Sequence, residues 1–166
     1  MFKKKFFTTI GLITFIFQNN VFLAKETDLL KLKETGNCIF CDLNNQDLFR
    51  ADLSFSNLSE SNLKFSNLSQ SNLFETSFSK SNLSNSDISM SNLSGAYLFA
   101  AKIRNSNLSG SDLYNTVCIE TDFSNSNLSY VKLDESNLNK ANLSKANLKH
   151  SSLNFTNLTR ANLYRA

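Results

Sequence analysis

A five-residue phrase repeats from Cys41 to Arg165, twenty-five times in succession, without an insertion or a change of phase. The phrase reads small residue, Asn or Asp, Leu, Ser, variable residue, as in the run from Ser56 to Glu60. Neither the 3.6-residue period of an α-helix nor the two-residue period of a flat strand fits this spacing. The period of five therefore constrains the architecture more than any other property of the chain.

Alternation within each phrase predicts which side chains are buried. In an extended segment, residues two apart point to the same side, so Ser56 and Leu58 share one side and Asn57 and Ser59 share the other. The next Leu follows after an odd number of residues, and a flat strand would place it on the opposite side. The chain must therefore turn a corner in every repeat to keep Leu inside, and a chain that does so stacks on itself as a solenoid.

The repeated phrase resembles that of the pentapeptide-repeat family, A(D/N)LXX, with Ser more often than Ala at the small position. The resemblance covers residues 41–165. It implies an all-β fold, a right-handed quadrilateral parallel β-helix in which four repeats make one coil and each repeat makes one side. We expect about six coils, stacked at the ~4.8 Å spacing of neighbouring strands.

The amino-terminal region divides into two further segments. Residues 1–24 resemble a signal peptide, because Lys3 to Lys5 form a basic start and residues 6–17 form an apolar run. That run is shorter than the ~18–20 residues of a membrane-spanning helix, although an uncleaved anchor is the alternative. Cleavage after Ala24 would send the chain to a periplasm, a thylakoid lumen or the extracellular medium. We expect no membrane contact after cleavage.

Residues 25–40 are predicted to form a helical cap on the repeats, which then occupy residues 41–166. Thr27 and Asp28 can begin a short helix, and Gly36 can follow its last turn. A cap is needed because an end coil exposes unpaired backbone and apolar side chains. The side chains expected to cover the first coil are Leu29, Leu30 and Leu32.

Three cysteines occur, and two of them form a CxxC motif, Cys38 and Cys41. In an exported chain the favoured interpretation is a local disulfide at the start of the repeats. A redox site is the weaker alternative because no βαβ pattern accompanies the motif, and two thiols are too few for a structural zinc site. Cys118 occupies a core Leu position and is predicted to be a buried, inert thiol.

Composition and motifs indicate no catalytic chemistry. The formal net charge of +3 comes from Lys3 to Lys5, so residues 25–166 are neutral, which argues against a nucleic-acid partner. The single histidine, His150, has no nucleophile placed by a motif, and there is no phosphate-binding loop or metal-ligand cluster. We therefore expect no enzyme activity, cofactor or metal. Residues 131–166 are locally basic, either as a solvated mixed surface or as a patch for an anionic partner.

One group of outward positions is apolar where the repeat is otherwise polar. With four repeats per coil, residues twenty apart lie on neighbouring coils, so Tyr97 lies beside Val117 and Phe99 beside Ile119. A contiguous exposed apolar area often marks a partner site, and these four residues are the predicted one. The alternative is a local departure from the repeat, in which Val117 or Ile119 turns inward around Cys118.

These observations favour a non-enzymatic exported scaffold that binds a protein partner or serves a structural role. The alternative is an inhibitor of a nucleic-acid enzyme that mimics a duplex, as some family members do. The repeat is still in phase at Arg165 and Ala166. This predicts either end-to-end association, as a homodimer through the C-terminal coil, or a frayed last coil.

Overall fold

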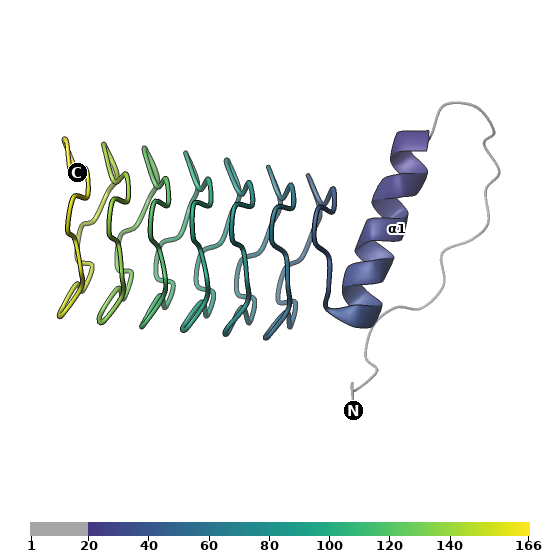
Figure 1. Ribbon diagram of the computed structural model, residues 1–166, viewed down its shortest axis with the longest axis horizontal. Coiled ribbons are helices and arrows are strands. Elements are labelled where there is room, and N and C mark those ends of the chain that lie inside the picture. The colour runs from purple at the N-terminus through teal and green to yellow at the C-terminus, as the bar shows by residue number, and fades with distance from the viewer. Residues whose placement is uncertain (1–19) are drawn as a thin grey trace.

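A helix followed by a tower of stacked coils makes up the described part of the protein (Figure 1). The computed structural model describes residues 20–166, with side chains from residue 26 onward. Helix α1 spans Asn20–Thr35, and the coils follow it directly. The predicted signal segment lies outside the described residues as far as residue 19, and residues 20–24 form the start of α1.

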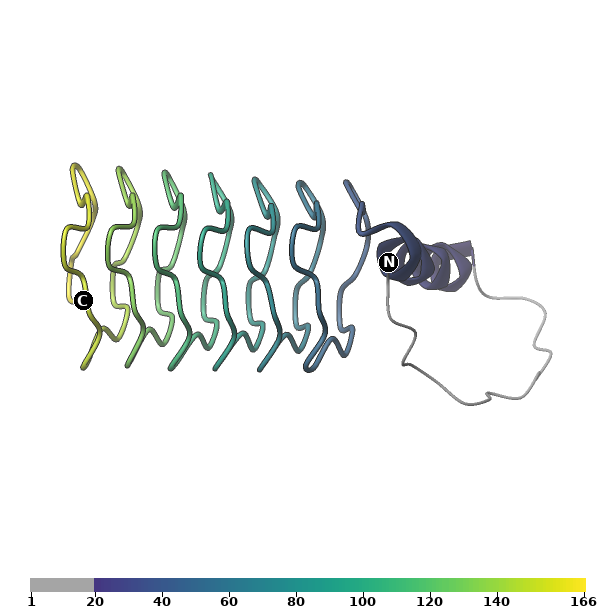
Figure 2. The ribbon, with the colours of Figure 1, turned by 90° about the horizontal axis from the view of Figure 1, so that it is seen from below.

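Each coil contains twenty residues. Parallel bridges join residues twenty apart along the whole tower, from Asn37 with Asn57 to Asn142 with Asn162. Bridges recur every five residues with a turn between them, so a coil has four sides, one repeat to a side. Figure 2 shows the coils stacked along the tower from a second direction. Each side pairs through a single bridge, and the described residues contain no longer strand. The β structure that we expected is thus a ladder of single bridges rather than a set of regular strands.

The four sides stack into four flat faces, which we number in chain order. Face 1 contains residues 36–40 and the repeats twenty, forty and further multiples of twenty residues later. Face 2 starts in the same way from residues 41–45, face 3 from 46–50 and face 4 from 51–55. Going around the coil, face 3 lies between faces 2 and 4 in one direction and face 1 lies between them in the other. Faces 2 and 4 are therefore opposite each other across the tower.

The tower interior contains the Leu positions and the small positions of the phrase. Leu58 and Leu108 are fully buried, as are Phe78 and Phe123, which replace Leu. The small Ser and Thr residues are also buried, and their hydroxyl groups donate to backbone carbonyl groups, as Ser66 does to Leu63 at 2.7 Å. Among the described residues, every buried side-chain polar atom has a hydrogen-bond partner. The predicted alternation of inward and outward residues is confirmed.

The fifth, variable position has a conformation that we did not predict. It is the corner of the coil, and twenty-four non-glycine residues there have positive φ angles between 51° and 62°. This left-handed region is disfavoured for most residues and is tolerated best by Gly and by Asn or Asp. The position is therefore variable in side chain but uniform in backbone, and its several Asn residues are explained by the turn.

The repeats begin earlier than the predicted boundary at residue 41. Asn37 already pairs with Asn57, and Cys38 occupies the first core position with no exposed surface. The helix is also longer than expected, since it starts seven residues before Thr27. Gly36 follows the last turn at φ +66° and donates its N–H to the carbonyl of Leu32, as its predicted role requires.

Helix α1 covers the first coil with both apolar and polar groups. Leu32 is buried and Leu29 packs against the core, but Leu30 is 53% exposed, so its predicted role in the cap is wrong. The reason is helical periodicity, which turns Leu30 away from the face that contacts the coil. Two backbone N–H groups of the first coil also find acceptors on the helix. Asp42 donates to the Asp28 carboxylate at 2.8 Å, and Asn37 donates to the Thr35 hydroxyl at 3.1 Å.

A disulfide joins Cys38 and Cys41 at this junction. Both cysteines are buried, at the first core position and at the first small position of face 2. The Cys38 sulfur also lies 3.2 Å from the carbonyl oxygen of Asp28 in α1. The bond therefore links two sides of the first coil directly below the helix that caps it.

Candidate functional site

The predicted apolar patch lies on face 1, across two neighbouring coils. Tyr97 and Val117 form a parallel bridge, and Ala100, after Phe99, donates its N–H to the carbonyl of Ile119 at 2.9 Å. The structure thus brings the four predicted residues together in two adjacent rows. Tyr97 is 50% exposed and Phe99 37%, whereas Val117 and Ile119 are half-buried.

The backbone of the repeat is undisturbed under the patch. Leu98 and Cys118, the core residues between the outward pairs, are both fully buried. The expected alternative, in which Val117 or Ile119 turns inward around Cys118, is not what the structure contains, because both keep their outward positions and are half-buried. Two exposed aromatic rings with two half-buried aliphatic side chains beside them form a compact apolar surface on an otherwise regular face.

Small corner residues border the coil that carries the two aromatic rings. Gly95 lies at the corner that precedes Tyr97, and Ala100 lies at the corner that follows Phe99. Towards the two ends of the tower, the equivalent outward positions are polar. These four flanking residues are Ser77, Ser79, Asn137 and Asn139. The patch is therefore bounded along the tower by hydrogen-bonding groups, and the Glu75 side chain lies over the corner at Gly95.

Potential metal ligands of the described part of the chain are not clustered, and its free thiol lies in the core. No group of three or more His, Cys, Asp and Glu side chains there could hold a metal ion. Burial raises the pKa of the Cys118 thiol to about 12, and a hydrogen bond with Thr116 lowers it by less. Because only the thiolate is nucleophilic, this cysteine is unreactive at neutral pH, as predicted for a core thiol.

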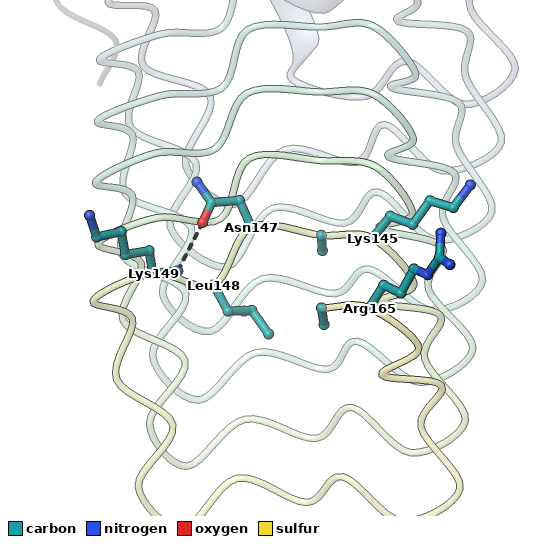
Figure 3. A pocket seen from close by; sticks show the side chains of 7 residues that line it. Lys145, Asn147, Leu148, Lys149 and Arg165 are labelled. Atoms are coloured by element: carbon teal, nitrogen blue, oxygen red, sulfur yellow. Dashed lines mark hydrogen bonds between the residues drawn. The ribbon is translucent and has the colours of Figure 1, made fainter.

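A shallow hollow with basic edges lies at the last coil (Figure 3). Lys145 and Arg165 project from one corner, one above the other, and Lys149 projects from the other side of the hollow. Leu148, at the floor, is half-buried. The hollow is open, and its basic edges make it an electropositive surface.

Two aromatic pairs outside the patch were not predicted. Phe55 and Phe74 meet edge to face at 5.3 Å on face 4, and Tyr130 lies 4.8 Å from the His150 ring at a corner of face 3. The twenty-residue spacing of Tyr130 and His150 was the available signal for the second pair. The first joins a corner residue to a side residue, a diagonal contact that the repeat spacing alone does not indicate.

Comparison with protein-family models identifies the repeat. The pentapeptide-repeat model matches eight copies, over residues 37–64, 51–89, 91–129 and 126–165. The chain belongs to the pentapeptide-repeat family. The matches start at residue 37, in agreement with the first bridge of the tower. None of the curated proteins compared matches the chain.

Several solved structures of pentapeptide-repeat proteins are similar to this one. A protein from the thylakoid lumen of Arabidopsis thaliana has 27% identity and a TM-score of 0.53, over 54% of this chain and 63% of its own. The pentapeptide-repeat protein Rfr23 of the cyanobacterium Cyanothece 51142 has 23% identity and a TM-score of 0.45, over 82% of this chain and 97% of its own. QnrB1, a plasmid-mediated fluoroquinolone resistance protein, has 15% identity and a TM-score of 0.49, over 76% and 70%.

These similarities differ in what they support. The chain spans about 63% of the length of the thylakoid-lumen protein. The other two similarities have TM-scores below 0.5 and carry no argument about function. Among the described residues, α1 has neither the length nor the apolar character of a membrane-spanning helix.

Proposed function

We propose that this pentapeptide-repeat protein is a non-enzymatic, exported scaffold that binds a protein partner through Tyr97, Phe99, Val117 and Ile119. The supporting observation is the exposure of the two aromatic rings on a flat face whose neighbouring rows are polar. Aromatic side chains supply large contact areas with few rotatable bonds, and they are enriched at the centres of protein interfaces.

The rigidity of the tower supports a scaffold role. Each coil bonds to the next through the backbone on all four sides, so the patch residues are held at fixed spacing by their neighbours. A binding surface that is already ordered loses little conformational entropy when the partner docks. The right-handed sense of the coil is carried over from the family and is part of the proposal.

Export is the second part of the proposal. It rests on the basic and apolar start of the chain and on the similarity to a thylakoid-lumen protein. The Cys38–Cys41 disulfide fits the oxidising conditions outside the cytoplasm. We expect the partner to be found in the same compartment, whether that is a periplasm, a thylakoid lumen or the medium.

A specific observation bears on the alternative, a duplex mimic. Face 4 is acidic, with a net charge of −4, and its acidic residues extend from Asp52 to Glu135. They span four coils, or about 19 Å at ~4.8 Å per coil. A DNA duplex of that length carries about eleven negative charges, one per ~1.7 Å. Face 4 is too weakly charged to imitate a duplex, so the scaffold is the better supported function.

A homodimer through the C-terminal coil remains part of the proposal. Leu153 and Leu158 are half-buried there and Leu163 is 44% exposed, whereas the equivalent residues of the inner coils are fully buried. Apolar contact between two such coils would cover these side chains. Replacement of Leu163 by Ser should lower the dimer fraction in sedimentation equilibrium, and an unchanged monomeric mass in both proteins would contradict the dimer.

Affinity capture from an extract of the exported fraction tests the partner site. The variant carries Tyr97→Asn, Val117→Asn, Phe99→Ser and Ile119→Ser, which restore the residues that the repeat most often has at these positions. Because the replacements follow the repeat, the variant should melt cooperatively at a temperature close to that of the original protein. We expect a partner protein to be retained by the original chain and lost by the variant.

A matched control removes aromatic surface elsewhere. Phe55 and Phe155 are exposed by 68% and 91% on face 4, and Phe55→Ser with Phe155→Ser should leave capture unchanged. Equal capture by the original chain and the face 1 variant would remove the patch from the proposal. Equal loss in the variant and the control would indicate nonspecific adhesion of aromatic surface and would also contradict it.

A further inference from the structure

Opposite faces of the tower carry opposite charge, although the repeats as a whole are neutral. Face 2 has a net charge of +3 and face 4 a net charge of −4, while faces 1 and 3 have +1 and 0. The charged residues of face 2 are Lys64, Lys102, Arg104, Lys145 and Arg165, with Asp42 and Asp122. Those of face 4 are Asp52, Glu75, Asp112, Asp134 and Glu135, with Lys132. Stacking of the coils therefore gathers onto one face charges that are scattered along the sequence.

Contacts inside the tower leave this imbalance in place. Ion pairs join neighbouring coils of the same face, Arg104 with Asp122 on face 2 and Lys132 with Asp112 on face 4. These pairs cancel equal numbers of charges and do not change either net value. On face 2 the exposed cations Lys102, Lys145 and Arg165 remain, and on face 4 the exposed acids Asp52, Glu75 and Glu135 remain.

We propose that copies of this protein associate side by side, with face 2 of one copy against face 4 of the next. Both partners in the contact are surfaces of the described chain, and their charges are complementary. Most of their outward positions between the charges are Ser or Asn. Exposed aromatic rings on both faces add apolar contact area, namely Phe65 and Tyr164 on face 2 and Phe55, Tyr114 and Phe155 on face 4. Complementary potentials steer association and select the orientation of the partners.

The opposed positions of the two faces determine the form of the assembly. A contact between two different surfaces of the same protein is heterologous, and it extends indefinitely unless a rotation closes it. Because faces 2 and 4 lie on opposite sides, successive copies form an open row in which face 1 of every copy points in the same direction. If face 1 binds a partner, a consequence that rests on the proposed function, a row would present several such sites together and raise avidity.

The contact should be weak and sensitive to salt, because exposed ion pairs are screened and contribute little individually. Sedimentation velocity of the full chain tests this at about 0.01 M salt, where the Debye length is ~30 Å, and at about 1 M, where it is ~3 Å. At protein concentrations on the order of 1 mM we expect the average mass at low salt to exceed twice that of the monomer. At high salt the face 2 to face 4 contact should be lost.

Charge-reversal variants identify the faces. Lys102→Glu, Lys145→Glu and Arg165→Glu make face 2 negative, so that both faces repel in this variant. Asp52→Lys, Glu75→Lys and Glu135→Lys make face 4 positive, and Lys already occupies the position of Asp52 in other repeats, at Lys102 and Lys132. Each variant alone should lose the salt-sensitive association, and an equal mixture of the two should regain it.

A control with the same change in charge separates the faces from net charge. Lys80→Glu, Lys140→Glu and Arg160→Glu alter face 1 by the same amount and should leave most of the association intact. An average mass above twice that of the monomer that persists at high salt, or a mixture that stays dissociated, would overturn the proposal. Equal loss in the face 1 control would also overturn it, because net charge rather than a particular face would then govern association. Loss of partner capture in the face 1 patch variant leaves this result unaffected, so the two proposals fail separately.

Discussion

The two ends of the tower are built from the same repeat, but α1 covers the first coil whereas no described element covers the last one. At the first coil, α1 covers the core with Leu32 and supplies acceptors from Asp28 and Thr35 for two backbone N–H groups. At the last coil the same core position is progressively exposed, to 44% at Leu163. The comparison shows that a Leu in this phrase is buried by the neighbouring coil or cap rather than by its own repeat.

This dependence on neighbours makes stability a property of pairs of coils. Repeat proteins of this kind are stabilised by contacts between adjacent units more than by any unit alone. A substitution should therefore have an effect that depends on its position along the tower, even where the local sequence is the same. The four predictions below test that dependence, from the largest expected effect to the smallest.

The largest effect is expected from the loss of a core side chain in a central coil. Leu108→Ala should reduce the free energy of unfolding by about 2–5 kcal/mol, because it leaves a cavity among fully buried neighbours. Leu163→Ala, the same change in the last coil, should cost less than about 1 kcal/mol. Denaturant unfolding measures both, and equal losses would show that position along the tower does not matter.

At the covered end, Asp28→Ala should destabilise the first coil by about 1–3 kcal/mol. The replacement leaves the N–H of Asp42 without its acceptor on α1, in a partly buried setting. Hydrogen exchange should show faster exchange at Asp42 than at Asn142, five coils away. The control is Lys31→Ala, an exposed change on the same helix, and a matching acceleration in that protein would attribute the effect to helix propensity.

The central coils should become less stable at high pH because of Cys118. Its pKa is raised from 9.0 to about 12 by burial, so the thiol ionises more readily in the unfolded chain than in the folded one. The free energy that the buried neutral thiol contributes to folding is complete below pH 9 and is lost between pH 9 and pH 12. At pH 10 this loss lowers the folding equilibrium constant about tenfold. Cys118→Ala should remove this part of the pH dependence, and an unchanged profile in that variant would assign it to other groups.

The smallest effect is expected at a corner. Ala100 has a φ of 53°, a conformation that glycine adopts without steric cost, so Ala100→Gly should stabilise the protein or leave it unchanged within about 1 kcal/mol. The gain from relieved strain is offset by the greater entropy of glycine in the unfolded chain. Arg165→Gly, in the last coil, should change the melting temperature less, and the reverse order would mean that the last coil is as ordered as the central ones.

Much of the fold followed from the spacing of particular residues. The alternation of Asn57, Leu58 and Ser59 predicted their inward and outward directions, because the five-residue period leaves no other arrangement that buries every Leu. Cys38 was missed as the first core residue because the pattern was defined by Leu. Gly36 and Asn37, a small residue and an Asn in the correct phase, were the signal that could have extended the repeat.

The candidate site was predictable in place but not in exposure. The spacing of Tyr97 and Val117 was enough to place them side by side, since residues twenty apart share a face. The half-burial of Val117 and Ile119 depends on the size of neighbouring side chains, which spacing does not specify. The opposite charges of faces 2 and 4 were also missed, because they emerge only when every repeat is assigned to its side.

The closure of each coil after four repeats has a consequence for how such a chain can change in length. Duplication of twenty residues would add one coil and leave every later side chain on its original face. Duplication of five residues before Lys145 would instead rotate all later repeats by a quarter of a turn. Lys145 and Arg165 would then move from face 2 to face 3, which now carries Asp47 and Asp87. Small copying errors in this gene could therefore redesign the surface without disturbing the interior.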